Sequence, residues 1–549
     1  MAYLRYLILL LFFYNNGFAQ ITFYKGTYFK AAKAKTDLEN IHQILKRNHP
    51  SYAWYTPANI TDAAFNNANE SIKDSISQLD FILLATKCIN NIKCGHTALF
   101  YTKKAIDSIN KSYTTVFPFN FIPIKDTLIN INCFLGNNYA FLTGTKVVTI
   151  NGLTSKQIID SLKPYHSGDG NADIYRERKL GNNFPFIYRN IFGLPKNLTI
   201  TFINKETQLD TAQCFLTNNI YYLKPKIKLI TKPIAIAAPV MLHEYSSKNA
   251  IQFVQAPITS ILPPVIKFDT NKLTLKNAKP IKPKNKQTTL TKRQRKKLNM
   301  QRQRSLTIDT LNSTAFIYLS AFKGSGFRKF IKHSFKTIKK GSLKNVVIDV
   351  RDNGGGLVSK YVYLTKYLSN KRFKVADTVS VPYKKLFKRH LIKQGFWNQA
   401  FITFFTTKGS DGRYHIKNYE NKYYKLKTTN HFNNNIYIIT GAYSFSATTL
   451  FANNLKGQQN ITLVGDETGG GHYGNSGILL PDIKIPNTDL ILHIPLFRVV
   501  INKNANKFGG GLKPDVLATP TAESLFKGTD VKKEAVLNLI KQKLIKPII

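Results

Sequence analysis

The pattern of apolar and polar positions changes twice along the first half of the chain. Between residues 36 and 93, apolar residues recur at helical spacing in two segments that prolines separate. From residue 117 to 223 the apolar runs are short, and an Asn-Gly turn at Asn151 stands between a strand-like run and an amphipathic helix. The pattern predicts an N-terminal helical domain over residues 20–100 and a compact β-rich module over residues 117–223.

The second half reads differently. Residues 225–305 are rich in proline and lysine and are interpreted as a linker or insertion. After Thr310, strand-like runs such as "KNVVIDV" alternate with helical ones such as "FRKFIKHSFKTIKK". Alternation of this kind buries an apolar sheet under helices, so we expect an α/β core over residues 306–525 and a C-terminal helix over residues 526–549.

The first twenty residues, MAYLRYLILLLFFYNNGFAQ, have the features of a secretory signal peptide. Arg5 precedes an apolar run, and Gly17 and Ala19 are small residues of the kind that a signal peptidase reads. The run is shorter than the roughly 20 residues that a membrane-spanning helix needs. We expect cleavage of residues 1–19 and export to the bacterial periplasm or the extracellular space; an uncleaved apolar helix is the alternative.

The chain carries a formal net charge of +49, which raises the question of an anionic partner. Residues 272–304 hold 13 lysines and arginines and no acidic residue, yet most of the positive excess lies elsewhere. The basicity is therefore global, and no nucleic-acid partner is expected. A solvated, flexible insertion is the favoured interpretation of residues 272–304, and contact with an anionic envelope surface is the functional alternative.

The four cysteines argue against both a disulfide-rich scaffold and a structural zinc site. They are too few for a disulfide scaffold, and their spacing is not that of a zinc site. Neither a metal nor an organic cofactor is predicted. Whether Cys88 and Cys94 form a disulfide is left open by their spacing.

Candidate chemistry begins at "GAYSFSATTL", residues 441–450, where a strand-like run meets a helix-like one. A serine at such a turn can expose its oxygen beside free backbone N–H groups at the start of the helix. Ser444 and Ser446 both stand there, and the simple alternative is that one of them caps the helix.

Two further segments strengthen the case for a nucleophile. In "VVIDVRDNGGG", residues 346–356, three glycines follow a strand and expose backbone N–H groups that could hold an oxyanion. "NIKCGHTALF", residues 91–100, supplies His96 at the junction of the helical region with the next strand. A lone histidine is more often structural, so His96 draws its interest from the other two segments.

Together with "LVGDETGGG" and "GGGLKPDV", these segments resemble the tail-specific, or carboxyl-terminal processing, serine protease family. The resemblance is closer to the branch of the tricorn core and the retinoid-binding-protein repeats than to the Ser/Lys branch, because the lysine position 25 residues after the serine is Gly471. It implies a crotonase/ClpP-like α/β catalytic core and a PDZ-like module at residues 117–223.

The resemblance also implies roles for particular residues. Ser446 is the expected nucleophile and His96 the general base, with the N–H groups of Gly355 and Ala447 as the oxyanion hole. A neutral histidine suits the removal of a serine proton near neutral pH. His472 is the competing base. Phe508 stands where the branch carries its orienting glutamate, and the acids near it in sequence are Asp466, Glu467 and Asp515.

The leading functional hypothesis is an exported serine peptidase that hydrolyses peptide bonds of a polypeptide substrate through an acyl-enzyme. An esterase or amidase would use the same residues. A catalytically silent family member that binds peptides or apolar ligands is the alternative, supported by Gly471 and Phe508. A binder of anionic surfaces or nucleic acid is a third hypothesis, based on charge alone. The sequence does not predict the substrate, its cleavage preference or the oligomeric state.

Overall fold

The computed structural model describes residues 24–111, 117–133, 143–204, 207–217, 220–223, 291, 298 and 301–545. The predicted signal peptide and most of the predicted linker lie outside the described residues. No helix in the described part of the chain is long and apolar enough to cross a membrane.

Helices dominate the N-terminal region, which packs its apolar faces together around Leu38, Ile41 and Phe81. Within it, residues 28–30 and 75–77 form a two-stranded antiparallel sheet. Its elements are β1 (Tyr28–Lys30), α2 (Ala31–Asn48), α3 (Ala58–Ser71), β2 (Ser75–Ser77) and α4 (Gln78–Asn90). Ser77 caps α4, because its Oγ accepts the N–H of Asp80 at 3.0 Å.

The strand that follows the N-terminal helices pairs with residues near the C-terminal end of the chain. Strand β3 (Ala98–Tyr101) pairs antiparallel with β21 (Leu490–His493), which in turn pairs with β20 (Asp482–Ile485). His96 lies just before β3, so this three-stranded sheet fixes it relative to the C-terminal half of the chain.

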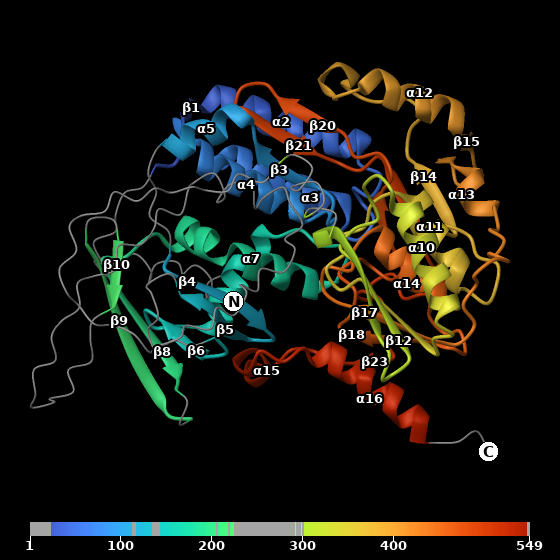
Figure 1. Ribbon diagram of the computed structural model, residues 1–549. Coiled ribbons are helices and arrows are strands. Elements are labelled where there is room, and N and C mark those ends of the chain that lie inside the picture. The colour runs from blue at the N-terminus through green and yellow to red at the C-terminus, as the bar shows by residue number, and fades with distance from the viewer. Residues whose placement is uncertain are drawn as a thin grey trace, which may run out of the picture.

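The β-rich module contains a seven-stranded sheet with the path β10-β9-β8-β6-β5-β4, and β7 pairs with β6. Its aromatic core includes Phe117, Phe121, Phe184 and Tyr188. The elements from β3 onward are α5 (Lys103–Lys111), β4 (Phe119–Ile124), β5 (Thr127–Cys133), β6 (Lys146–Ile150), β7 (Leu153–Thr154), α6 (Ser155–Leu162), η1 (Lys163–Tyr165), α7 (Asp173–Phe192), β8 (Asn197–Ile203), β9 (Leu209–Thr217) and β10 (Ile220–Leu223). Figure 1 shows α7 between this sheet and the N-terminal helices.

The largest α/β unit is a six-stranded sheet of order β11-β12-β13-β17-β18-β23, in which only the edge strand β11 is antiparallel. Its strands are β11 (Arg304–Asp309), β12 (Thr314–Leu319), β13 (Asn345–Asp349), β17 (Asn435–Thr440), β18 (Ile461–Gly465) and β23 (Val516–Leu517). Helices α10 (Phe327–Lys340), α11 (Val358–Leu368) and α14 (Ala447–Leu455) cover one face. Helix α16 (Val531–Ile545) covers the other, where Val536 and Ile540 pack on Val347 and Ile439 (Figure 1).

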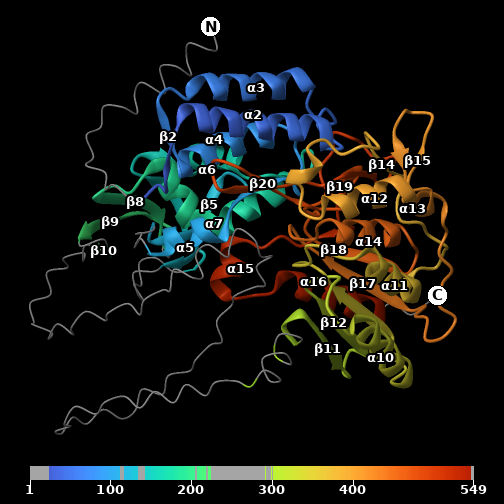
Figure 2. The same ribbon diagram turned by 90° about the horizontal axis from the view of Figure 1, so that it is seen from above.

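A second sheet, of order β15-β16-β14-β22-β19, lies beside this unit. Its strands are β14 (Thr378–Val381), β15 (Thr407–Lys408), β16 (Tyr414–His415), β19 (Gly474–Gly477) and β22 (Phe497–Val500). The remaining elements are η2 (Arg389–Leu391), α12 (Gly395–Phe405), α13 (Lys417–Asn421) and α15 (Ala522–Lys527). Viewed from above, α15 lies next to the β-rich module and α12 on the opposite side of the molecule (Figure 2).

The α/β alternation predicted after Thr310 is confirmed: "FRKFIKHSFKTIKK" forms α10 and "KNVVIDV" contains β13. The fold is mixed α/β with a helical N-terminal region and several sheets. The residues that form the second sheet and β20–β21 were not assigned from the sequence. Cys88 and Cys94 are free thiols, which answers the question of a disulfide between them. The predicted domain boundaries and the PDZ-like character of residues 117–223 stay predictions.

Candidate active site

Ser446 lies at the turn between β17 and α14 in a backbone conformation that serine rarely adopts. Its φ is 56° and its ψ is −122°, and it directly precedes the first residue of α14. A non-glycine residue held in such a region stores roughly 1–3 kcal/mol of strain, and strain of this kind concentrates at functional sites. The side chain is half-buried and makes no cap to the helix. A nucleophile on a tight strand-to-helix elbow would have this backbone geometry.

Ser444, the other serine of the segment, has a structural role. It is fully buried; its Oγ accepts the Gly441 N–H at 3.0 Å and donates to the carbonyl oxygen of Val350 at 2.8 Å. These bonds tie the turn to the end of β13. The Ser444 hydroxyl therefore already uses its proton and one of its acceptor sites in hydrogen bonds within the protein.

The glycines after β13 lie against the elbow. A Cβ at Gly355 would stand 2.8 Å from Ser446 Cβ and 3.0 Å from the Ala447 nitrogen. Gly355 therefore allows the segment from "VVIDVRDNGGG" to approach the serine. The Ala447 N–H has no hydrogen-bond partner among the described residues, as an oxyanion donor should, whereas the Gly355 N–H donates to Asn353 Oδ1 at 2.9 Å.

Asn353 holds the two segments together. It is fully buried, its Oδ1 also accepts the Thr448 hydroxyl at 2.8 Å, and its carbonyl oxygen accepts the Phe445 N–H at 3.1 Å. The Gly355 N–H would have to exchange its bond to Asn353 for one to substrate before it could serve as an oxyanion donor.

The close approach of Gly355 leads to a prediction. Gly355→Ala is expected to lower the rate at which a fluorophosphonate labels Ser446 by about 100-fold. The new Cβ must displace Ser446 or Phe445, and a small displacement of a reacting group lowers the rate by about that factor. The matched control is Gly457→Ala, where φ is +77° and no atom lies within 4 Å of the new Cβ. The control should lose about 1 kcal/mol of stability with its labelling rate unchanged; equal labelling rates in the two variants would contradict the assignment.

His96 is brought beside the elbow. Its ring lies 4.7 Å, centroid to centroid, from the ring of Phe445, the residue before Ser446. Burial, assisted by His493 and Lys179, lowers the pKa of His96 to about 3. The ring is therefore neutral near pH 7, and its Nδ1 is buried without a partner in the described part of the chain.

Sequence reasoning missed a carboxylate that lies next to His96. Asp169, in the turn before α7, is 1% exposed, and its Oδ1 accepts the Gly95 N–H at 2.8 Å. Burial raises the pKa of Asp169 to about 7, against the stabilising effect of the N–H groups of Gly95 and Gly471. An acid between two glycines in "SGDGN" reads as an ordinary turn residue, so the sequence carried no signal for it.

Two residues of α7 were missed as well. The Tyr175 ring stacks on Phe445 at 4.3 Å, with 5° between the ring planes. The Nζ of Lys179 lies 5.1 Å from the centroid of the Tyr175 ring and donates to Ser167 Oγ at 3.0 Å. Burial lowers the pKa of Lys179 to about 8 although Asp169 opposes that shift, so a second base that titrates near neutral pH lies in the same neighbourhood.

The competing base His472 is directed elsewhere. Its Nε2 interacts with Asn453 Oδ1 at 3.1 Å, and its backbone N–H donates to Gly510 at 3.0 Å. Asn453 lies seven residues beyond Ser446, about 10 Å along α14 at the usual helical rise. Burial lowers the pKa of His472.

The acids that the sequence offered as orienting groups bind backbone or lysine. Glu467 Oε1 accepts the Gly511 N–H, and burial raises the pKa of this side chain. Asp466 pairs with Lys532, and Asp515 accepts the Leu463 N–H at 2.8 Å and pairs with Lys456. The ring of Phe508 is 57% exposed.

One group of side chains in the described residues has the composition of a metal site. Cys94 Sγ, a ring nitrogen of His96 and a carboxylate oxygen of Asp169 all lie within 4.8 Å of one another. Burial raises the pKa of the Cys94 thiol to about 12, so the thiolate that a metal requires is strongly disfavoured.

Comparison with known proteins relates this chain to a peptidase family. Residues 313–518 match the model of peptidase family S41. No curated protein matches the chain by sequence. Among solved structures, mature CPAF complexed with lactacystin has a TM-score of 0.58 at 11% identity, over 94% of this chain and 98% of that chain.

Two further structures show the range of the likeness. Mature CPAF alone has a TM-score of 0.57 at 11% identity, over 93% of this chain and 97% of that one. The photosystem II D1 C-terminal processing protease has a TM-score of 0.36 at 11% identity, over 91% and 98% of the two chains. At these identities the likeness to CPAF supports the fold alone. Residues 313–518, which match the family model, contain both Ser446 and the glycines after β13.

Proposed function

The chain belongs to peptidase family S41, and from that premise we propose that it is a serine peptidase in which Ser446 is the nucleophile and His96 the general base. The observation that carries the proposal is the conformation of Ser446. Its positive φ at the start of α14, with Gly355 in close approach, presents the hydroxyl where a substrate carbonyl could meet it. A helix cap would need neither feature.

The proposed reaction proceeds through an acyl-enzyme. Ser446 Oγ forms a bond to the peptide carbonyl carbon as its proton moves to His96, and the oxyanion accepts the Ala447 N–H. When the tetrahedral intermediate collapses, the C–N bond breaks and the proton passes from His96 to the leaving amine. Water then attacks the ester carbonyl carbon and gives a proton to His96; the ester C–O bond breaks, and His96 returns that proton to Ser446 Oγ as the acid product leaves.

Membership of a peptidase family supports a polypeptide as the substrate. The β-rich module supplies a sheet whose terminal strands in the order of pairing are β4 and β10. An extended polypeptide could add to such an edge, which is the mode proposed for a PDZ-like module. No carboxylate-binding loop is assigned to it.

Digestion of an unfolded model protein tests the proposal. Casein incubated with the mature protein should acquire new amino termini, and a Ser446→Ala variant should produce none above background. A p-nitrophenyl ester serves as the second substrate. Ester hydrolysis without cleavage of casein would replace the peptidase by an esterase, and failure of the folded protein with both substrates and with a fluorophosphonate would contradict catalysis altogether.

That last outcome would favour the alternative of a catalytically silent protein that binds peptides or apolar ligands. Phe508 supports it, because an exposed aromatic ring stands at the position of the expected acid. Binding of casein without turnover would identify this case.

Export to the periplasm or the extracellular space is part of the proposal. It is supported by the charge, apolar run and small residues of residues 1–19. Contact of the basic segment 272–304 with an anionic envelope surface is proposed on charge alone.

A further inference from the structure

A serine–histidine pair works best when a third group orients the histidine and stabilises its protonated form. The position where the family resemblance places a glutamate is Phe508 here. The acids near it in sequence accept backbone N–H groups or pair with lysines, as described above. The inference that follows rests on the proposed function and concerns how His96 could act as a base without that glutamate.

Asp169 is a buried carboxylate close to His96. A ring nitrogen of His96 and a carboxylate oxygen of Asp169 lie within 4.8 Å of each other. Both His96 Nδ1 and Asp169 Oδ2 are buried without a hydrogen-bond partner in the described residues. Unsatisfied buried polar atoms are rare and costly, and these two belong to neighbouring side chains and are complementary, since a ring N–H can donate to a carboxylate oxygen. Catalytic hydrogen bonds are often long in a free enzyme and shorten in its complexes.

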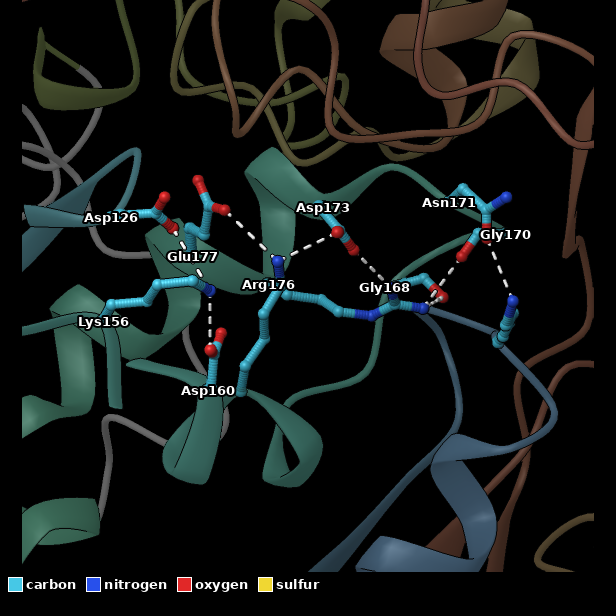
Figure 3. Close-up of polar contacts among 11 residues, drawn as sticks. Asp126, Lys156, Asp160, Gly168, Gly170, Asn171, Asp173, Arg176 and Glu177 are labelled. Atoms are coloured by element: carbon cyan, nitrogen blue, oxygen red, sulfur yellow. Dashed lines mark hydrogen bonds and ion pairs between the residues drawn. The ribbon is translucent and has the colours of Figure 1, made fainter. Parts of the chain in front are cut away.

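Hydrogen bonds to three other segments of the chain hold the turn that contains Asp169. In Figure 3 the Arg176 guanidinium from α7 reaches the turn, where its Nη2 donates to the carbonyl oxygen of Gly170 at 2.8 Å and lies 3.5 Å from that of Gly168. The Gly170 N–H donates to the carbonyl oxygen of Lys93 at 2.9 Å, near the base of the His96 segment. Asn171 Nδ2 donates to the carbonyl oxygen of Phe508 at 2.8 Å.

This last contact places the turn beside the segment that should have supplied the glutamate. We propose that Asp169 is the positioning acid of the active site: it receives the Nδ1 proton of His96 in a hydrogen bond and stabilises the imidazolium that forms when Ser446 attacks. The acid thus comes from the β-rich module instead of the C-terminal segment around Phe508.

Electrostatics make the role dependent on pH. Burial disfavours the charged forms of both His96 and Asp169. It therefore lowers the pKa of His96 to about 3 and raises the pKa of Asp169 to about 7. Below pH 7 a protonated Asp169 cannot stabilise an imidazolium, and above it the carboxylate can. The rate of serine attack should therefore rise with pH through about 7. The titratable and charged groups that face Asp169 are Arg176, Lys179, Cys94, Tyr55 and Tyr175.

A metal ion is the rival occupant of the same side chains. It would need the Cys94 thiolate, and burial, the largest cause, raises the pKa of that thiol to about 12. A hydrogen bond between His96 and Asp169 does not require the Cys94 thiol to ionise. Cys94→Ser should therefore keep the labelling rate close to that of the wild type.

The test is the rate of fluorophosphonate labelling between pH 5 and 9. Here Ser446 Oγ forms a bond to phosphorus, its proton goes to His96, and fluoride leaves. Asp169→Asn should lower the rate at pH 8 by at least about 100-fold and remove the rise near pH 7. Glu467→Gln is the matched control, since it neutralises the carboxylate at Gly511 and should keep both rate and profile.

A second variant keeps the test valid if Asp169→Asn does not fold. Arg176 favours the ionised form of Asp169, so Arg176→Gln should move the midpoint of the profile to higher pH. A purely structural role of the arginine would lower the amount of folded protein and leave the midpoint in place. Lys179→Met excludes the buried lysine as the titrating base: it should lower the rate only modestly, with the rise in rate retained.

The outcomes separate the two proposals. If the wild type is not labelled, or Ser446→Ala is labelled equally, the proposed function fails. If the wild type is labelled at Ser446 but folded Asp169→Asn keeps its rate and profile, or Lys179→Met alone abolishes the rise, the assignment of Asp169 is wrong and the peptidase proposal stands.

Discussion

Ser446→Ala is expected to abolish labelling by a fluorophosphonate and to lower kcat for peptide hydrolysis by roughly 10⁴–10⁶-fold, the range seen when a serine nucleophile is removed. The physical reason is that only the Ser446 Oγ is proposed to form the bond to the substrate, whereas the Ser444 hydroxyl in the same turn is buried and bound to Gly441 and Val350. Thermal stability should be unchanged or slightly improved, because alanine loses no hydrogen bond that the structure gives to Ser446 Oγ. The measurement is the labelling rate together with kcat on casein.

Ser444→Ala is the matched control in the same turn. It removes both bonds of a buried hydroxyl, to Gly441 and Val350, and should lower the free energy of unfolding by about 1–3 kcal/mol. The folded fraction should still be labelled. Loss of labelling in a folded Ser444→Ala protein, with Ser446→Ala still labelled, would exchange the roles of the two serines.

His96→Ala is expected to lower the labelling rate by about 10²–10⁴-fold, the usual contribution of general base catalysis. The imidazole is neutral throughout the range from pH 5 to 9, because burial lowers the pKa of His96 to about 3. Its loss should therefore affect the rate across that whole range. The measurement is the labelling rate at several pH values with the fold verified by circular dichroism.

His472→Ala is the control for the second histidine, since its ring contacts Asn453 on α14. We expect the labelling rate to stay within a few-fold of the wild type. A large loss in His472→Ala with little loss in His96→Ala would contradict the assignment of the base.

The parallel core was predictable because its signal is local. Strands such as β13 and β17 are continuous apolar runs, and the intervening helices carry an apolar face. Each of these elements can therefore be predicted from its own residues. The strands β3 and β21 are short and pair over nearly 400 residues of sequence. Nothing within "ALFY" or "LILH" specifies that partner, which is decided by packing of the folded chain.

The candidate site divides in the same way. Ser446 and Gly355 each stand in a turn between a strand and a helix, a pattern visible within a few neighbouring residues, and the structure places Gly355 against Ser446. Asp169 belongs to a different module, and its burial beside Gly95 and His96 depends on contacts from Arg176 and Lys93. A polar residue in a glycine-rich turn becomes chemically unusual only when the fold removes it from water.

The central claim is that Ser446 is an activated nucleophile, and mapping of the fluorophosphonate adduct on the wild-type protein tests it most directly. Digestion followed by mass spectrometry should locate a single adduct on the peptide that contains Ser446, with the unmodified hydroxyl at Ser444. An adduct on another residue, or a folded protein that carries none after prolonged exposure, would contradict the account.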